Sequence, residues 1–324
     1  MTLITSTYNK TPDIPNFNDD YLKGLLWTGA RWGTGTGVTV TYSFPQSGSY
    51  YEDQTAETGA FIPVNTDTQR VISEQIISQF SSVANITFTL ITETPTAHAD
   101  IRIAFSYAKA VTEPTVSGWA GSPGARTGGD VWLAKSVING PYEPGAAPFH
   151  NVIHELGHAM DLKHTQESPA MPLEQESHSY SVMSYTEYRN VYMIGRGNTD
   201  VDYRAETLML EDIRALQYIY GPNFNSKSGD TTYKWSESTG AMTTTDTALN
   251  GTQTTSTMTP YVNKIMMTVW DGGGTDTYDF SDYSTGVNVN LQPGEWTTTA
   301  ANQLPSYDVG FGPAAAPPGN IANA

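Results

Sequence analysis

The sequence contains no cysteine and no long run of apolar residues. Without thiols, no disulfide can stabilise the fold and no thiolate can serve as a metal ligand. A cytosolic protein fits this composition, and so does a bacterial protein that reaches an oxidising exterior without cysteines. No segment approaches the roughly 20 apolar residues of a membrane-spanning helix, so we expect no membrane partner. The chain has 324 residues, of which 38% are hydrophobic, and can bury a sizeable core.

Basic residues are also scarce, because 16 Lys and Arg stand against 33 Asp and Glu, a formal net charge of -17. Nucleic acids and anionic membranes are bound by clustered Lys and Arg, so we expect neither as a partner. An excess of carboxylates fits Ca²⁺ binding and fits a solvated acidic surface equally well. The N-terminal segment has no basic start and no apolar h-region, so no Sec-type signal peptide is recognisable.

Periodicity predicts a mixture of strands and helices before Asn223. Alternating β-branched and aromatic residues predict strands at 37–44, 86–92 and 100–107, with shorter candidates at 117–121 and 130–134. A helical stripe covers 67–83, with Thr66 or Asp67 as its cap, and a second helix at 211–220 is stopped by Gly221-Pro222. We expect the first forty residues to be irregular. The fold class is therefore α/β or α+β.

The composition changes near Asn223. From there the chain is rich in Thr, Ser, Gly and Asn and shows little helical periodicity. We therefore expect one domain over residues 1–222 and a β-rich region over 223–324. The final segment, GPAAAPPGNIANA, is typical of a tail.

The strongest chemical signature is HELGHAMDLKH at residues 154–164. On a helix, His154 and His158 are one turn apart and project from the same face, where both imidazoles can ligate one Zn²⁺. Glu155 lies about 100° around the helix from His154. It can therefore reach a zinc-activated water as general base without being a ligand. Three histidines with a glutamate in this spacing are far more specific than a lone buried histidine.

The third histidine needs a turn in the chain, because a straight helix would carry His164 about 9 Å beyond His158 along the axis. Such a turn needs a residue with positive φ, usually glycine, and here that residue is Asp161. Asp and Asn tolerate left-handed geometry better than other non-glycine residues, at a strain of about 1 kcal/mol. We expect a positive φ at Asp161 and His164 as the third zinc ligand. In the alternative, Asp161 continues the helix and His164 faces solvent.

About twenty residues downstream, the chain reads Ser181-Val182-Met183-Ser184-Tyr185. Together with the histidine segment, this sequence resembles the metzincin clan of zinc proteases, whose metal site lies above a tight turn carrying a methionine. The resemblance implies that Met183 forms a hydrophobic floor under the imidazoles. It also implies that Tyr185 can ligate zinc and then swing away to stabilise the oxyanion. Taken alone, each residue would be interpreted as core packing.

Within that clan the chain resembles the serralysin branch. It lacks cysteine, MLEDIRALQYIYGPN (209–223) is similar to the helix that closes the serralysin catalytic domain, and WDGGGTDTYDF (270–280) is similar to the start of its β-roll. The implied fold is an α/β (α+β) zincin domain with a mixed twisted sheet and an active-site helix, followed by a truncated RTX-type β-roll. Asp161 departs from the pattern, as does a C-terminus that precedes any tandem roll repeats.

The same resemblance implies a structural calcium site. Residues 271–279 fit the nonapeptide roll repeat once, in which glycine carbonyls and an aspartate ligate Ca²⁺. The implied ligands are the side chains of Asp271 and Asp276 and the carbonyls of Lys227, Gly229, Thr231 and Gly273. A solvated turn is the alternative, because DGGG is also a strong turn sequence.

Zinc proteases commonly bind a peptide as an added antiparallel strand at a sheet edge. Our candidate for that edge is the segment of Ser117, Gly118, Trp119, Ala120 and Gly121. An internal strand without a substrate role is an equal alternative. We expect two further histidines, His150 and His178, to occupy unused surface positions.

The sequence therefore predicts a secreted, serralysin-like zinc metalloendopeptidase that hydrolyses polypeptides, with Glu155 and Tyr185 as catalytic residues. From the resemblance alone we expect bacterial type I export, a monomer, and a proteinaceous inhibitor as a further partner. One rival interpretation is a narrow-specificity metzincin that processes a single surface protein. Another is a catalytically silent metal-binding or adhesion module. The intact Glu155 argues against silence, because a purely structural zinc site does not require it.

Overall fold

A computed structural model describes residues 9–10, 19–27, 30–35, 37–48, 51, 55–109, 112–113, 115–186, 203–305 and 319–324. The α-helices are α1 (Asp20–Leu25), α2 (Thr55–Gly59), α3 (Thr66–Val71), α4 (Ser78–Val83), α5 (Ala147–Ala159) and α6 (Leu210–Tyr220). The N-terminal strands are β1 (Asn9–Lys10), β2 (Ala30–Arg31), β3 (Val38–Ser43), β4 (Phe61–Ile62), β5 (Ile86–Leu90), β6 (Ile101–Ser106), β7 (Gly118–Ala120) and β8 (Asp130–Ala134). The C-terminal strands are β9 (Asp230–Trp235), β10 (Met242–Thr247), β11 (Gln253–Met258), β12 (Met267–Val269), β13 (Thr277–Asp279), β14 (Trp296–Thr297) and β15 (Ile321–Asn323).

A mixed sheet with the strand order β5-β3-β6-β8-β7 organises the N-terminal region. β3, β5, β6 and β8 pair in parallel, whereas β7 runs antiparallel to β8 at the edge and β4 pairs antiparallel with β6. Every residue of β8 is buried, as expected for a parallel strand covered on both faces. The predicted mixed α/β character of this region is confirmed.

The helical stripe predicted for residues 67–83 is present as α3, a π-helical segment at Ile72–Ile77, and α4. Its cap differs from the prediction. The side chain of Asn65 accepts a hydrogen bond from the Thr68 amide at 2.9 Å, so the helix begins one residue earlier than expected. Ile72, Ile76 and Phe80 form its buried stripe.

The expectation of an irregular N-terminus is wrong for residues 20–25, which form α1. Asp19 caps this helix by accepting hydrogen bonds from the amides of Tyr21 and Leu22 at 3.1 and 3.2 Å. Leu22 and Leu25 are buried. Two leucines in six residues are too few for a helical period to be recognised in the sequence.

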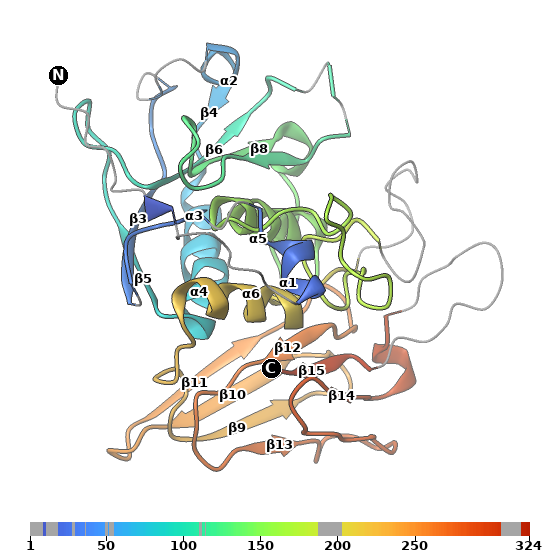
Figure 1. The fold of residues 1–324 in the computed structure, drawn as a ribbon. Helices are drawn as coiled ribbons and strands as arrows, with labels where there is room; N and C mark the ends of the chain where they lie inside the picture. The colour runs from blue at the N-terminus through green and yellow to red at the C-terminus, as the bar shows by residue number, and fades with distance from the viewer. Residues whose placement is uncertain are drawn as a thin grey trace.

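The C-terminal region is rich in β-structure, as predicted. Its described strands form two sheets, in the orders β11-β10-β9-β13 and β12-β15-β14. In Figure 1 these strands, coloured orange to red, gather on one side of the molecule, and the N-terminal sheet lies on the other side of α5 and α6.

The tail expected at the C-terminus is wrong for residues 321–323. These residues form β15, which pairs in parallel with β12 and antiparallel with β14. Ile321 and Ala322 are completely buried. A three-residue strand after a segment rich in Ala, Pro and Gly has too little pattern to be recognised in the sequence.

The two regions share one apolar core. Met266, Trp296 and Ala322 from the β-rich region belong to the same buried cluster as the N-terminal helices and sheet. The rings of Tyr180 and Trp296 meet edge to face at 5.7 Å. The boundary near residue 222 is a prediction that this shared core leaves untested. None of the described helices combines the length and apolar character that a membrane crossing requires.

A buried carboxyl group lies at this junction. Glu206 Oε1 accepts hydrogen bonds from the Tyr203 hydroxyl at 2.7 Å and the Met266 amide at 2.9 Å. Its Oε2 has no partner among the described residues. Burial raises the pKa of Glu206 to about 8, against the opposing effect of these two hydrogen bonds. The folded protein therefore retains a proton here that an unfolded chain releases.

We predict that Glu206→Gln gains stability relative to the wild type as the pH rises. Because the folded pKa is about 8 and the ordinary value is 4.5, the wild type loses stability between these two values. The loss is at most about 1.4 kcal/mol per pH unit. The substituted amide keeps an acceptor oxygen and cannot ionise. Urea denaturation at about pH 5 and about pH 8.5 measures the difference, and an equal difference at both pH values would contradict the prediction.

Candidate metal centre and active site

Helix α5 carries the first two histidines through the interior of the protein. Pro148 lies in its first turn, where a fixed φ and a missing N–H are tolerated. Ten of its thirteen residues are buried, and the helix packs against β7 and β8. An enclosed helix holds His154 and His158 in fixed positions relative to the sheet.

The end of α5 forms a Schellman motif. The Leu162 amide donates to the Gly157 carbonyl at 2.9 Å, and the Asp161 amide donates to the His158 carbonyl at 3.0 Å. In this motif the residue after the cap adopts left-handed geometry, and Asp161 has a φ of 79°. The predicted positive φ is therefore present. The chain reverses here instead of continuing the helix.

The segment leading to His164 is then held by the N-terminal region. Leu162 forms a bridge with Leu26, the Trp27 amide donates to the Asp161 carbonyl at 3.0 Å, and the Lys163 amide donates to the Leu25 carbonyl at 2.8 Å. The buried Lys163 ammonium also donates to three carbonyls, those of Gly24, Glu167 and Pro169, at 2.7–3.0 Å. Sequence analysis missed this anchor, because a lysine beside a histidine ordinarily indicates a surface position.

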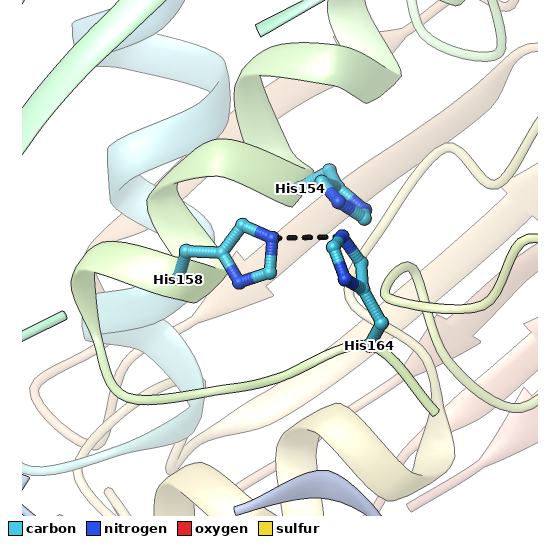
Figure 2. Close-up of side chains that lie close together, drawn as sticks. All are labelled: His154, His158 and His164. Carbon is cyan, nitrogen blue, oxygen red and sulfur yellow. Dashed lines mark hydrogen bonds between the residues drawn. The ribbon is translucent and has the colours of Figure 1, made fainter. Parts of the chain in front are cut away.

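The three histidines meet at one point, as Figure 2 shows: His154 and His158 project from α5, and His164 reaches them from the chain that follows. One nitrogen from each ring lies within 4.8 Å of the others. Nε2 of His158 and Nε2 of His164 are 3.1 Å apart. These side chains can therefore share a metal ion.

The outer nitrogen of each ring has its own partner. His154 Nδ1 is 2.8 Å from the Val182 carbonyl, and His158 Nδ1 is 2.8 Å from the Leu162 carbonyl. His164 Nδ1 is 2.7 Å from Glu167 Oε1. An acceptor at Nδ1 places the ring proton there and leaves the Nε2 lone pair for a metal. The donor set and its orientation fit Zn²⁺.

Burial keeps the imidazoles of His154 and His158 neutral, which is the form that binds a metal. It lowers the pKa of His154, with further lowering from His158 and His164. It lowers the pKa of His158 to about 4, again with a contribution from His164.

Tyr185 lies at the triad, and Met183 lies against the helix that carries two of the histidines. Met183 is completely buried, and its sulfur lies so close to Gly157 of α5 that a Cβ added there would meet it at 2.5 Å. The Tyr185 hydroxyl is 2.8 Å from His164 Nε2, and its ring stacks on His154 at 5.7 Å. Burial, together with the nearby carboxyl groups of Glu155 and Glu167, raises the pKa of Tyr185 to about 12.

Glu155, on α5, is only 4% exposed, and its Oε2 has no hydrogen-bond partner among the described residues. Burial raises its pKa to about 8, and Lys109 acts in the opposite direction. A Cβ added at Gly118 would lie 2.7 Å from Glu155 Oε1. The glycine of β7 therefore lets this carboxyl group lie against the edge strand.

The predicted substrate segment lies at the edge of the N-terminal sheet. β7 pairs with β8, and the flanking residues continue this pairing: the Ala134 amide donates to the Ser117 carbonyl at 2.9 Å, and the Gly121 amide to the Asp130 carbonyl at 3.1 Å. Among the described strands, none pairs with the other side of β7. Its alternation places Gly118 toward Glu155 and Trp119 opposite Trp132 on the next strand.

The expectation that His150 and His178 lie at the surface is wrong. They are 3% and 1% exposed, and their rings lie 4.7 Å apart. Burial lowers the pKa of His178 to about 3, and Arg204 contributes to the lowering. Because α5 is enclosed on most sides, residue 150, one turn before His154, has no solvent-facing position available.

The two segments predicted to bind calcium lie side by side. The Gly272 amide donates to the Ser226 carbonyl at 2.9 Å, and Asp276 Oδ1 accepts from the Thr231 amide at 3.0 Å. Asp271 accepts from the Gly273 amide at 2.9 Å and from the Tyr233 hydroxyl at 2.7 Å. Lys227 has a φ of 50°, so the loop before β9 is sharply bent. Carboxylate and carbonyl oxygens are thus gathered here, and such a donor set suits Ca²⁺.

Comparison with known sequences identifies relatives over most of the chain. The family model described as "Peptidase M10 serralysin C terminal" matches residues 222–300. Serralysin B of Dickeya chrysanthemi is 28% identical over 81% of this chain and 53% of its own length. Metallopeptidase AprA of Pseudomonas marginalis is 27% identical over 78% and 52%, and the serralysin of Proteus mirabilis 26% over 91% and 62%.

These relatives are named as metalloproteases. The same class is indicated by a histidine triad formed by a helix of a mixed α/β domain and the segment that follows this helix. More particularly, the chain is a homologue of the serralysins, with a β-rich region that matches the serralysin C-terminal family. It spans about half the length of the curated relatives it matches first.

We predict that Glu167→Ala weakens zinc binding by roughly 10–100-fold, because the outer partner of a metal-binding histidine fixes its orientation and basicity. Glu167→Gln, which retains an uncharged acceptor, is expected to lose less. Competition with a chromophoric chelator measures the affinity. The control is Glu74→Ala, which removes an exposed carboxylate paired with Arg70 on a helix surface. Equal affinities for Glu167→Ala and this control would refute the prediction.

Proposed function

We propose that this chain is a secreted, serralysin-like zinc endopeptidase. The observation that carries the proposal is the convergence of three imidazoles beside a buried glutamate that lies against Gly118 of an edge strand. A metal site that serves only the fold does not need this glutamate. The homology to metalloproteases supports the same class of reaction.

Zinc, when bound by His154, His158 and His164, supplies Lewis acidity and lowers the pKa of a water molecule to about 7. Glu155 takes the proton from the attacking water and delivers it to the leaving amine. Its raised pKa of about 8 reflects burial, and a bound divalent cation lowers that pKa again. Glu155 is then an ionised base whose basicity is tuned near neutral pH.

Tyr185 is proposed to stabilise the oxyanion. Because its pKa is raised to about 12, the phenol stays protonated at neutral pH and can donate a hydrogen bond to a developing negative charge. Its hydroxyl already lies 2.8 Å from His164 Nε2, beside the point where the ligands meet. Met183 supports the imidazoles from below.

The substrate is proposed to be a polypeptide that pairs with residues 117–121 as an antiparallel strand. The backbone groups of this segment that face β8 are already bonded, and among the described strands none pairs with its other side, where the peptide is proposed to bind. Gly118 lies directly against Glu155, so a peptide paired here passes the general base. Pairing through the main chain favours broad cleavage specificity.

We also propose the finer architecture of this family for the chain. Residues 1–222 would form a metzincin domain and residues 223–324 the start of an RTX-type β-roll. The roll would bind structural Ca²⁺ through Asp271, Asp276 and the neighbouring carbonyls. We further propose that the protein is a monomer and acts outside the cell after type I export. A proteinaceous inhibitor is proposed as a further partner.

We predict that Glu155→Ala retains zinc and the fold but loses nearly all hydrolysis of casein, because the substitution removes the proposed proton acceptor. Zinc content, circular dichroism and casein cleavage are measured together. Glu206→Gln is the matched control, since it removes another buried glutamate with a raised pKa of about 8 that bonds Tyr203 and Met266 instead. Retained activity in Glu155→Ala would exclude the proposed mechanism. A wild type that binds zinc fully and cleaves no peptide would favour the silent metal-binding module.

We predict that Ca²⁺ raises the melting temperature of the wild type and that Asp276→Asn abolishes most of this rise. A ligand present at 100 times its Kd stabilises the folded state by about 2.7 kcal/mol. Differential scanning fluorimetry with Ca²⁺ or with EGTA measures the effect. Asp282→Asn, which removes an exposed carboxylate paired with Lys234, is the control. An unchanged melting temperature in EGTA would contradict a structural calcium site.

A further inference from the structure

A buried carboxylate with three hydroxyl donors lies between the two chain segments that form the active site. Glu176 is 7% exposed. Its Oε1 accepts from the Thr165 hydroxyl at 2.7 Å and from the Ser184 hydroxyl at 2.9 Å, and its Oε2 accepts from the Thr186 hydroxyl at 2.5 Å. Among the described residues, no ion pair joins Glu176 to a cation. A buried carboxylate of this kind depends on its hydrogen-bond donors.

Each of these donors is next in sequence to a residue of the site. Thr165 follows His164, whereas Ser184 and Thr186 stand on either side of Tyr185. The Ser184 hydroxyl also accepts a hydrogen bond from the Thr186 amide at 3.0 Å, so the residues on either side of Tyr185 are bonded to each other. One carboxylate therefore joins the segment of the third histidine to the segment of the tyrosine.

The segments that carry His164 and Tyr185 differ in the number of interactions, besides those with Glu176, that fix them. His164 is also fixed by its bond to Glu167, by the Schellman motif at Asp161, and by the Lys163 ammonium. The backbone on both sides of Tyr185 is held by two of the three hydroxyls that donate to Glu176, and otherwise by the bond from the His178 amide to the Thr186 carbonyl at 2.9 Å. Loss of the carboxylate should therefore displace Tyr185 more than His164.

A second buried carboxylate holds the other half of the same turn. Asp212 accepts from the Ser181 hydroxyl at 2.6 Å and from the amides of Val182 and Met209 at 2.8 and 2.9 Å. The Val182 carbonyl is the partner of His154 Nδ1. Asp212 thus reaches a metal-binding histidine through Val182, whereas Glu176 reaches the tyrosine.

We propose that Glu176 is a positioning residue that fixes the Tyr185 phenol relative to His164 for stabilisation of the oxyanion. The proposal rests on the endopeptidase function proposed above. Glu176 touches neither substrate nor metal in this role and acts through Ser184 and Thr186. Two buried carboxylates then hold residues 181–186: Asp212 bonds the part that contacts His154, and Glu176 bonds the part that carries Tyr185.

We predict that Glu176→Gln keeps a full equivalent of zinc and lowers kcat roughly 10–100-fold, the usual range for an outer partner of a metal site, with little change in KM. Tyr185→Phe should give a similar loss. Combining the two should add little, because both act on one group, whereas a general structural defect would add to the effect of Tyr185→Phe. Glu206→Gln again controls for the removal of a buried carboxylate.

A readout independent of activity is the visible absorption of the Co²⁺-loaded protein. We expect Glu176→Gln to change it in the same way as Tyr185→Phe, and Glu206→Gln to leave it unchanged. If Glu176→Gln fails to fold, Thr186→Val removes one donor with little change in volume, and Thr165→Val removes the donor on the histidine side. The proposal requires the larger loss of kcat from Thr186→Val.

Additive losses for Glu176→Gln and Tyr185→Phe would overturn the proposal, as would a Co²⁺ spectrum that Glu176→Gln leaves unchanged. A wild type that cleaves no peptide would instead refute the endopeptidase function. In that case the Co²⁺ spectra still decide whether Glu176 positions Tyr185.

Discussion

The reversal of the chain after His158 is the constraint on which the rest of the metal centre depends. Helix α5 can present two imidazoles to one point, but a third from the same stretch requires the backbone to turn back within a few residues. Asp161 makes this turn as the left-handed residue of a Schellman motif, at a φ of 79°. The strain of order ~1 kcal/mol is opposed by the pairing of residues 161–163 with 25–27 and by the three carbonyl bonds of Lys163.

The buried carboxyl groups around the centre differ in how fully they are bonded. Glu176 and Asp212 each accept three hydrogen bonds, so their oxygens are occupied and the turn between them is rigid. Glu155 has an oxygen without a partner among the described residues, and burial raises its pKa to about 8. Fully bonded carboxylates specify geometry, whereas a buried carboxyl with spare lone pairs is available for proton transfer. Glu206 shares these features at the junction of the two regions, so Glu155 is singled out as the proposed base by its additional position against Gly118 on the helix of His154 and His158.

Much of the fold and of the candidate site was predictable from local patterns. Period-two alternation located β3, β5 and β6, the two short candidates corresponded to β7 and β8, and helical periodicity located α6 and the segment around residues 66–83. Spacing alone brought His154 and His158 to one face of a helix, and steric reasoning anticipated the positive φ of Asp161. The metal itself, the roles of Glu155 and Tyr185, and the calcium ligands remain predictions, now with a geometry that can be tested.

What the sequence determined by itself was what depends on near neighbours along the chain: the helix that presents two histidines, the residue type tolerated at its left-handed end, and the strands that alternate. Only the tertiary structure decided which polar groups are buried and what they contact. The burial of His150 and His178, the anchoring of Lys163 by α1, and the strand at residues 321–323 are examples. The physical reason is that such groups bond residues far apart in the sequence, as Thr165 bonds Glu176 and Ser181 bonds Asp212. No helical or strand periodicity in the sequence predicts these pairs. Such contacts exist only once the sheets and helices have packed around them.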